Sequence, residues 1–112
     1  PFFIHLQRND LFAFAGIWTA ELSNSGTMTN SCSIITKPSI SNLSSIHSRM
    51  PVILNKGQEM IWMSENSYLT GMLSSLSKKT SEPDILADHI STYVNSPHHS
   101  DEECIVPIPK LL

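Results

Sequence analysis

The spacing of apolar residues changes its period twice along the chain. Before position 55 the apolar runs are short and rich in β-branched and aromatic residues, as in strands. Between positions 59 and 76 apolar residues recur at helical spacing, and from position 85 the pattern is again strand-like. Strands, then helices, then strands are typical of an α+β domain. We therefore predict a mainly antiparallel β-sheet with two short helices.

The length and charge of the chain limit the number of domains it can form and the kind of nucleic-acid contact it can make. Its 112 residues, 40% of them hydrophobic, predict one small globular domain. The net charge of -3 argues against a surface that coats nucleic acid generally, because such a surface needs clustered Lys and Arg. Any contact with nucleic acid is therefore expected to be local.

The length of the apolar runs and the first residues of the chain bear on where the protein is located. No run approaches the roughly 20 apolar residues of a membrane-spanning helix, and the first residues lack the layout of a signal peptide. The two cysteines, Cys32 and Cys104, lie far apart and match no disulfide-rich pattern, which favours a reduced cytoplasmic setting, and we predict no membrane partner. The chain begins with PFFIHL, inside a strand-like pattern and without Met, which predicts a fragment.

Strand-like patterns before position 55 predict a local order of elements. Residues 2–6 and 11–18 are expected to form a hairpin across polar residues 7–10. The second arm is apolar on both faces, as in a covered central strand, so Trp18 is expected in the core, with base stacking as the alternative. Residues 21–30 read as a surface loop that turns at positions 24–26.

Further strands and helices follow along the chain. Residues 32–36 predict a strand that ends around Pro38, and residues 40–45 a helical turn around Leu43. A first helix is expected to begin at Asn55 or Gly57 and to stop at Asn66. A second helix is predicted by an apolar stripe at i, i+3, i+4 and i+7, formed by Leu69, Met72, Leu73 and Leu76. A strand region is expected at 85–94, and an extended edge segment at 104–109.

The block IHSRMPVIL, residues 46–54, carries the clearest chemistry. His47 and Arg49 are two residues apart, so on an extended segment their side chains lie on the same side. An imidazole that transfers protons beside a permanently charged guanidinium suits a phosphorylated or nucleic-acid substrate. The alternative is a plain surface pair at the entry to a strand.

The cysteines and remaining histidines give weaker signals. A zinc site from His98, His99, Cys104 and Cys32 matches no known ligand spacing, so we expect no metal and no cofactor. A nucleophilic pair of Cys32 with His47 is possible in principle, but a cysteine in a buried strand is usually an inert hydrophobe.

Several segments, in order along the chain, resemble the SRAP family, the SOS-response-associated peptidases that process abasic sites in single-stranded DNA. The matching segments are PFFIH, FAFAGIW, SIIT, IHSRMPVIL, the Trp62-Met63 helix, ISTYVNSP and ECIVPI. The resemblance implies that residues 1–112 are the C-terminal portion of a single SRAP domain. Its barrel-like sheet is then incomplete at the N-terminus, which leaves an exposed edge and makes the missing N-terminal half-domain a candidate partner.

The resemblance implies a DNA-damage response protein, which would be associated with the nucleoid if bacterial and nuclear if eukaryotic. In the family, an N-terminal cysteine condenses through its α-amine with the aldehyde of the abasic sugar, and its thiol closes the imine to a thiazolidine, a covalent DNA-protein crosslink. The same cysteine is linked to self-removal of a short leader. The resemblance places this cysteine and the family's catalytic glutamate before Pro1, so enzymatic activity of this chain stays open.

The resemblance assigns roles to residues of this chain. His47 matches the active-site histidine, Arg49 a phosphate-contacting arginine and Thr36 a hydroxyl that contacts the DNA backbone; Trp18 and Pro51 are further candidates for the DNA path. The chain departs from the family pattern at residues 37–40. Two alternatives remain: a cysteine-type peptidase whose His47 serves a nucleophile, and a non-catalytic binding fragment.

Overall fold

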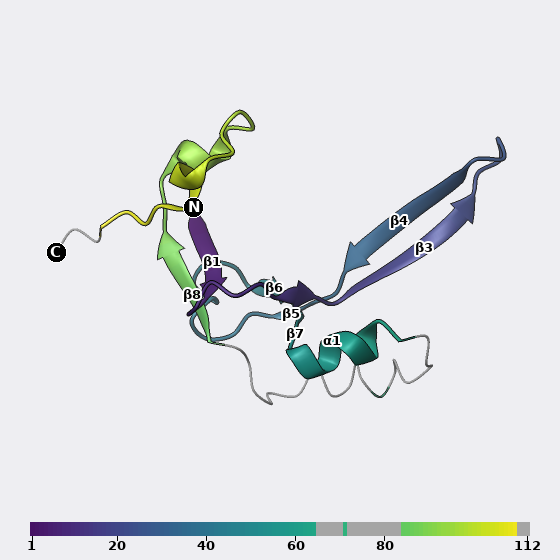
Figure 1. Cartoon of the computed structure of the whole chain (residues 1–112), viewed down its shortest axis with the longest axis horizontal. Coiled ribbons are helices and arrows are strands. Elements are labelled where there is room, and N and C mark those ends of the chain that lie inside the picture. The colour runs from purple at the N-terminus through teal and green to yellow at the C-terminus, as the bar shows by residue number, and fades with distance from the viewer. Residues whose placement is uncertain (65–70, 72–83, 110–112) are drawn as a thin grey trace. The chain divides into compact units, whose positions relative to one another are not determined.

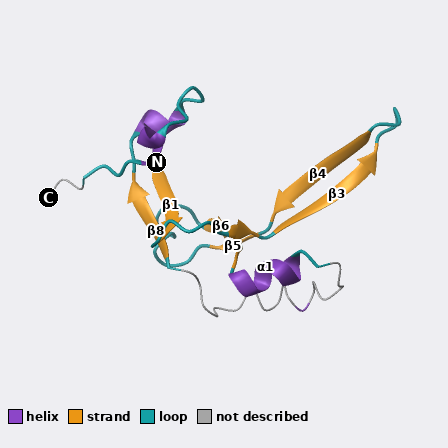
Figure 2. Ribbon diagram, in the orientation of Figure 1, coloured by secondary structure: helices purple, strands orange, loops and turns teal. Residues whose placement is uncertain are grey.

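The computed structural model describes residues 1–64, 71 and 84–109. The chain divides into two compact units, one formed by Pro1–Leu11 with Asp84–Leu112 and the other by Phe12–Pro83. The described strands pair antiparallel throughout, which confirms the predicted fold class (Figures 1 and 2). Within the described ranges these pairs form two-stranded sheets, and they do not close into a barrel.

The unit Phe12–Pro83 is built from three antiparallel strand pairs. β3 pairs with β4, β5 with β6, and β2 with β7. The strand bounds are β2 Ala13–Phe14, β3 Gly16–Leu22, β4 Met28–Ile34, β5 Thr36–Pro38, β6 Arg49–Pro51 and β7 Ile53–Leu54. One residue separates β2 from β3, β4 from β5, and β6 from β7, so three longer segments each change partner partway along.

The three pairs meet at the separating residues, Ala15, Ile35 and Val52. The Ala15 N–H donates to the Val52 carbonyl at 2.8 Å, the Val52 N–H to Ile35 at 2.9 Å, and the Ile35 N–H to Ala15 at 2.9 Å. Each residue thus donates once and accepts once in a closed ring of backbone hydrogen bonds. This junction satisfies the polar groups that would otherwise be orphaned where the strands change partner.

The hydrophobic core of this unit lies at the same junction. Ala15, Val52 and Leu54 are buried, with Ala13, Ile35 and Trp62 packed against them. The junction is crowded, which accounts for the small residues that the sequence places at positions 13 and 15. The β3–β4 pair leaves this core, and every residue of its two strands is exposed.

Helix α1, Lys56–Trp62, begins where the sequence predicted. The Asn55 side chain accepts from the Gln58 N–H at 3.0 Å, and the Gln58 side chain accepts from the Asn55 N–H at 3.0 Å, which forms a capping box. The Trp62 Nε1–H donates to the Gly16 carbonyl at 2.9 Å and so ties the helix to the junction. The second predicted helix lies outside the described residues. In the described part of the chain, no helix is long and apolar enough to cross a membrane.

The β3–β4 pair corrects two predictions. Residues 21–30 are not a loop: β3 runs to Leu22 and β4 starts at Met28, with Ser23 N–H bonded to the Thr27 carbonyl at 2.9 Å. Only the predicted turn is correct, and Gly26 adopts the positive φ of 80° that it needs. Trp18 is 73% exposed instead of buried, because the ribbon runs outward from the junction (Figure 1).

The unit of Pro1–Leu11 with Asp84–Leu112 also differs from the prediction. β1, Phe2–Leu6, pairs with β8, Ile85–His89, instead of forming a hairpin with residues 11–18. A local hairpin was predicted because sequence patterns detect turns but not partners some 80 positions away. The strand region expected at 85–94 ends at His89. Two short 3₁₀ helices follow, Thr92–Asn95 and Glu102–Ile105, and Ile90 bridges to Pro107 in the extended end segment.

Candidate nucleic-acid interface

The β5–β6 pair carries three of the residues assigned from the sequence. In its register Thr36 lies opposite Pro51 and Pro38 opposite Arg49, so the side chains of these four residues share one face. Lys37 and Met50 occupy the other face, where Met50 is buried. Burial of Met50 fixes which face turns outward, because a shift of one residue would expose Met50 and bury Arg49.

The Arg49 guanidinium is held by Thr36. Its Nε–H donates to the Thr36 Oγ1 at 3.1 Å, and Nη2 donates to the same oxygen at 2.8 Å and to the Thr36 carbonyl at 2.7 Å. Nη1 makes no hydrogen bond to the described residues, and Arg49 is exposed. The guanidinium is therefore oriented in advance and retains donors for a ligand.

The charge of Arg49 is not neutralised locally. Both acceptors on Thr36 are uncharged oxygens, and Arg49 forms no ion pair with a carboxylate in the described ranges. A guanidinium oriented by neutral groups attracts an anion more strongly than one already paired with Asp or Glu. This arrangement suits a phosphate.

His47 precedes β6 and is tied to the backbone of Arg49. The Arg49 N–H donates to His47 Nδ1 at 3.0 Å, and the same nitrogen lies 2.9 Å from the Arg49 carbonyl oxygen, to which it donates when protonated. The ring therefore keeps a hydrogen bond whether Nδ1 carries a proton or not. Nε2 has no hydrogen-bond partner in the described part of the chain, which leaves it available for proton exchange with a ligand.

The structure thus brings His47, Arg49, Thr36 and Pro51 together on β5, β6 and the residues before β6. His47 is not on an extended strand with Arg49, as the spacing predicted, but lies between the turn at residues 41–46 and the start of β6. Trp18 lies on another strand pair, β3–β4, opposite Cys32. No local pattern indicates that Thr36 contacts Arg49, because they are 13 positions apart.

The two cysteines differ in solvent exposure. Cys32 is exposed on β4, which overturns its expected burial, whereas Cys104 is buried. Neither is in a disulfide. Among the described residues, no group of three or more His, Cys, Asp or Glu side chains is placed to bind a metal ion. Among the described residues, the His47 ring forms its hydrogen bonds with the Arg49 backbone and not with a thiol.

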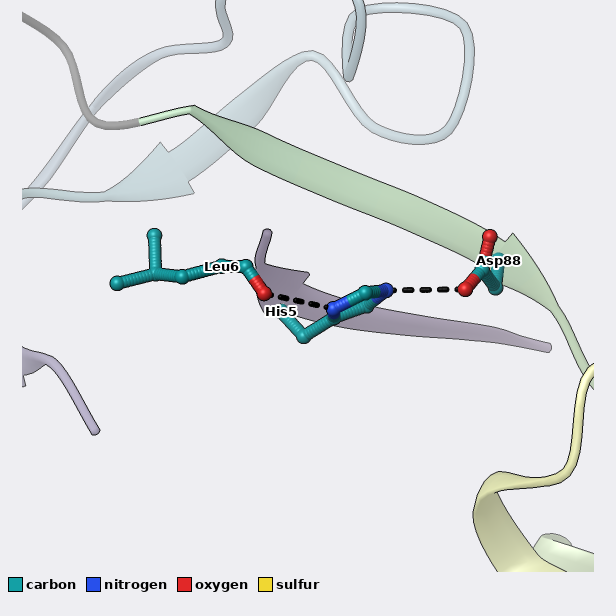
Figure 3. Close-up of polar contacts among 3 residues, drawn as sticks. All are labelled: His5, Leu6 and Asp88. Carbon is teal, nitrogen blue, oxygen red and sulfur yellow. Dashed lines mark hydrogen bonds and ion pairs between the residues drawn. The ribbon is translucent and has the colours of Figure 1, made fainter. Parts of the chain in front are cut away.

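A second histidine with a defined environment was not predicted. His5 on β1 has its Nδ1 at 2.9 Å from the Leu6 carbonyl and its Nε2 at 2.9 Å from Asp88 on β8 (Figure 3). Both nitrogens face acceptors, so the doubly protonated ring satisfies both. The Leu6 carbonyl and then Asp88 raise the pKa of His5 above its ordinary value of 6.5. Sequence reasoning missed this site because Asp88 is 83 positions away.

The structure therefore defines an antiparallel β protein with an exposed arginine whose guanidinium is aligned by uncharged oxygens. The model of the SRAP family, "SOS response associated peptidase (SRAP)", matches residues 1–97. The chain belongs to the SRAP family.

Relatives and a solved structure agree with this assignment. The chain is 34% identical over 105 residues to the abasic site processing protein YoqW of Bacillus subtilis and of Bacillus phage SPbeta, covering 94% of this chain and 47% of each relative. It is 33% identical to the abasic site processing protein YoaM of Bacillus subtilis, covering 94% of the chain and 46% of YoaM.

A crystal structure of a protein from Bacteroides thetaiotaomicron matches with a TM-score of 0.78 at 25% identity, over 97% of this chain and 48% of that one. The chain therefore spans about half the length of the relatives it matches.

Proposed function

We propose that this chain forms the His47 and Arg49 side of an abasic-site processing site, with single-stranded DNA as the substrate. The observation that carries the proposal is the Arg49 guanidinium, exposed, aligned by two neutral oxygens of Thr36 and free of carboxylate partners in the described residues. A DNA phosphate is the ligand that this geometry favours. The names of YoqW and YoaM, abasic site processing proteins, support the same substrate.

In this proposal Arg49 positions the DNA and His47 exchanges protons. The hydrogen bond of Nδ1 to the Arg49 backbone holds the imidazole in place while Nε2 gives a proton to, or takes one from, the opened abasic sugar. Thr36 keeps the guanidinium aligned and has a hydroxyl hydrogen left to donate to a neighbouring phosphate. Pro51 flanks this face.

The covalent step needs a nucleophile that His47 and Arg49 do not supply. A thiazolidine forms from an α-amine and a thiol on one cysteine, and neither Cys32 nor Cys104 carries a free α-amine. We therefore place the nucleophile in the part of an SRAP domain that this chain does not span. A cysteine peptidase that uses His47 needs a thiol within hydrogen-bond reach of the ring. The His47 ring is instead hydrogen-bonded to the Arg49 backbone, which does not support the peptidase hypothesis.

The test is binding to a single-stranded oligonucleotide that carries one tetrahydrofuran abasic site, followed by fluorescence anisotropy. The chain should bind it, and Arg49→Gln should weaken binding roughly ten- to a hundredfold, as expected for a charged hydrogen bond worth roughly 1.5–3 kcal/mol. Lys56→Gln removes the same charge from the exposed start of α1 and is the matched control. Equal weakening by both variants, or no binding by the parent chain, would contradict the proposal.

A further inference from the structure

The β3–β4 ribbon has two chemically different faces. In an antiparallel pair, residues directly opposite one another project to the same face. The register pairs Gly16 with Ile34, Trp18 with Cys32, Ala20 with Asn30, and Leu22 with Met28, so these eight residues form one face, which we call the apolar face. The opposite face, the polar face, consists of Ile17, Thr19, Glu21, Thr29, Ser31 and Ser33.

Large side chains on the apolar face are open to solvent. Trp18 is 73% exposed, Leu22 68%, Met28 60% and Ile34 53%. These residues cluster by register along one side of a single ribbon, and such a contiguous exposed apolar surface marks an interaction site more often than scattered exposed residues do. Every residue of β3 and β4 is exposed, so neither strand is covered by the described part of the chain.

The charge of the ribbon favours a protein over nucleic acid as its partner. β3 and β4 contain no Lys or Arg, and their charged residue is Glu21. Single-stranded nucleic acid binds surfaces that combine stacking aromatics with positive charge, and the second component is lacking here. Trp18 is therefore better suited to an apolar protein contact than to the DNA path.

We infer that the apolar face binds the portion of an SRAP domain that this chain does not span, whether that portion lies on the same polypeptide or on another. The relatives are about twice as long as the matched region, since the chain covers 46–48% of each. That length is enough to cover the apolar face with a complementary layer of the same domain. The inference depends on family membership and not on the proposed DNA chemistry, so either can fail alone.

Cys32 provides a probe inside the apolar face. It lies directly opposite Trp18 and is exposed, whereas Cys104 is buried, so a maleimide should label Cys32 first in the isolated chain. The neighbouring position on β4, Ser33, lies on the polar face. A Ser33→Cys substitution in a Cys32→Ser background therefore moves the thiol by one residue to the other face and serves as the matched control.

The experiment is to co-express the chain with the part of YoqW that it does not cover, purify the complex and compare labelling rates with those of the chain alone. The thiol of Cys32 should be protected at least tenfold in the complex, while the thiol at position 33 stays reactive. Trp18→Thr should reduce recovery of the complex, and Ile17→Thr, at a neighbouring exposed site on the polar face, should not.

Three results would overturn the inference. One is failure of the two parts to form a complex. The second is a complex in which Cys32 labels as fast as in the chain alone. The third is concentration-dependent dimerisation of the chain alone that Trp18→Thr abolishes, because the occupant of the apolar face would then be a second copy. None of these results bears on binding of Arg49 to DNA, which the anisotropy measurement tests by itself.

Discussion

The β5–β6 pair and the β3–β4 ribbon leave the same junction and differ in what they present. The first has an outward face of Thr36, Pro38, Arg49 and Pro51, with a guanidinium aligned by neutral oxygens. The second has an outward face of Trp18, Leu22, Met28 and Ile34, without a positive charge on either strand. Both are short two-stranded pairs, so side-chain chemistry, and not backbone architecture, separates a surface for an anion from one for a protein.

The two pairs also differ in how they are anchored. β5–β6 buries Met50 on its inner face, whereas β3–β4 buries nothing along its length. A two-stranded ribbon without a covered face is marginal by itself, so the ribbon depends on the junction at one end and on its partner along its side. The same substitution should therefore cost more at the junction than along the ribbon.

The largest effect is expected at the junction. Leu54 is 4% exposed and belongs to the core cluster, so Leu54→Ala should lower the free energy of unfolding by about 2–5 kcal/mol. Leu22→Ala makes the same chemical change at the outer end of the ribbon, where the side chain is 68% exposed, and should cost less than about 0.5 kcal/mol. Urea unfolding followed by circular dichroism measures both. Similar losses would mean that the ribbon is packed in solution.

A smaller effect is expected from Thr36. Thr36→Val keeps the shape and removes the Oγ1 acceptor, which should lower affinity for abasic single-stranded DNA several-fold through about 0.5–1.5 kcal/mol of lost alignment. Thr36→Ser keeps the hydroxyl and should restore affinity. Thr19→Val, an exposed threonine on the polar face of the ribbon, is the control and should have no effect. Weak binding by the serine variant would show that the hydroxyl is not what matters.

The smallest effect concerns the other unit and leaves both strand pairs unchanged. The pKa of His5 is raised in the folded protein, so the protonated ring stabilises the β1–β8 pair fully below pH 6.5, and this contribution is lost as pH rises through the raised pKa. A partly exposed ion pair of this kind contributes roughly 0.2–1 kcal/mol. Thermal unfolding between pH 5.5 and 8.5 should therefore favour wild type over His5→Gln at the acidic end only. A pH-independent difference would contradict the assignment.

Local chemistry made part of this structure predictable. Asn55 and Gln58 define a helix start within four positions, and Gly26 supplies the positive φ of the β3–β4 turn, so both features are visible in the sequence. The changes of strand partner at Ala15, Ile35 and Val52 are not visible in the sequence, because no local pattern indicates which distant strand a segment pairs with. The exposure of Trp18 was missed for a related reason, since apolar residues predict burial only where a covering layer exists.

The family resemblance named Thr36 together with His47 and Arg49, whereas spacing named only His47 and Arg49. Spacing placed His47 and Arg49 side by side as two ligand-facing groups. In the structure Arg49 is held by Thr36, and His47 by the Arg49 backbone, so the unit is a set of three residues. Its anchoring through a residue 13 positions away required the β5–β6 register, which follows from the fold and not from the local sequence.

The contrast between the two strand pairs is tested most directly by the salt dependence of binding to abasic single-stranded DNA, measured in parallel for the parent chain, Arg49→Gln and Trp18→Thr. If Arg49 contacts a phosphate, its variant should reduce the slope of log affinity against log salt by about 0.7, the value per phosphate contact on single strands. Trp18→Thr should leave affinity and slope unchanged. A normal slope for Arg49→Gln together with weakened binding by Trp18→Thr would contradict the account and assign the DNA surface to the ribbon.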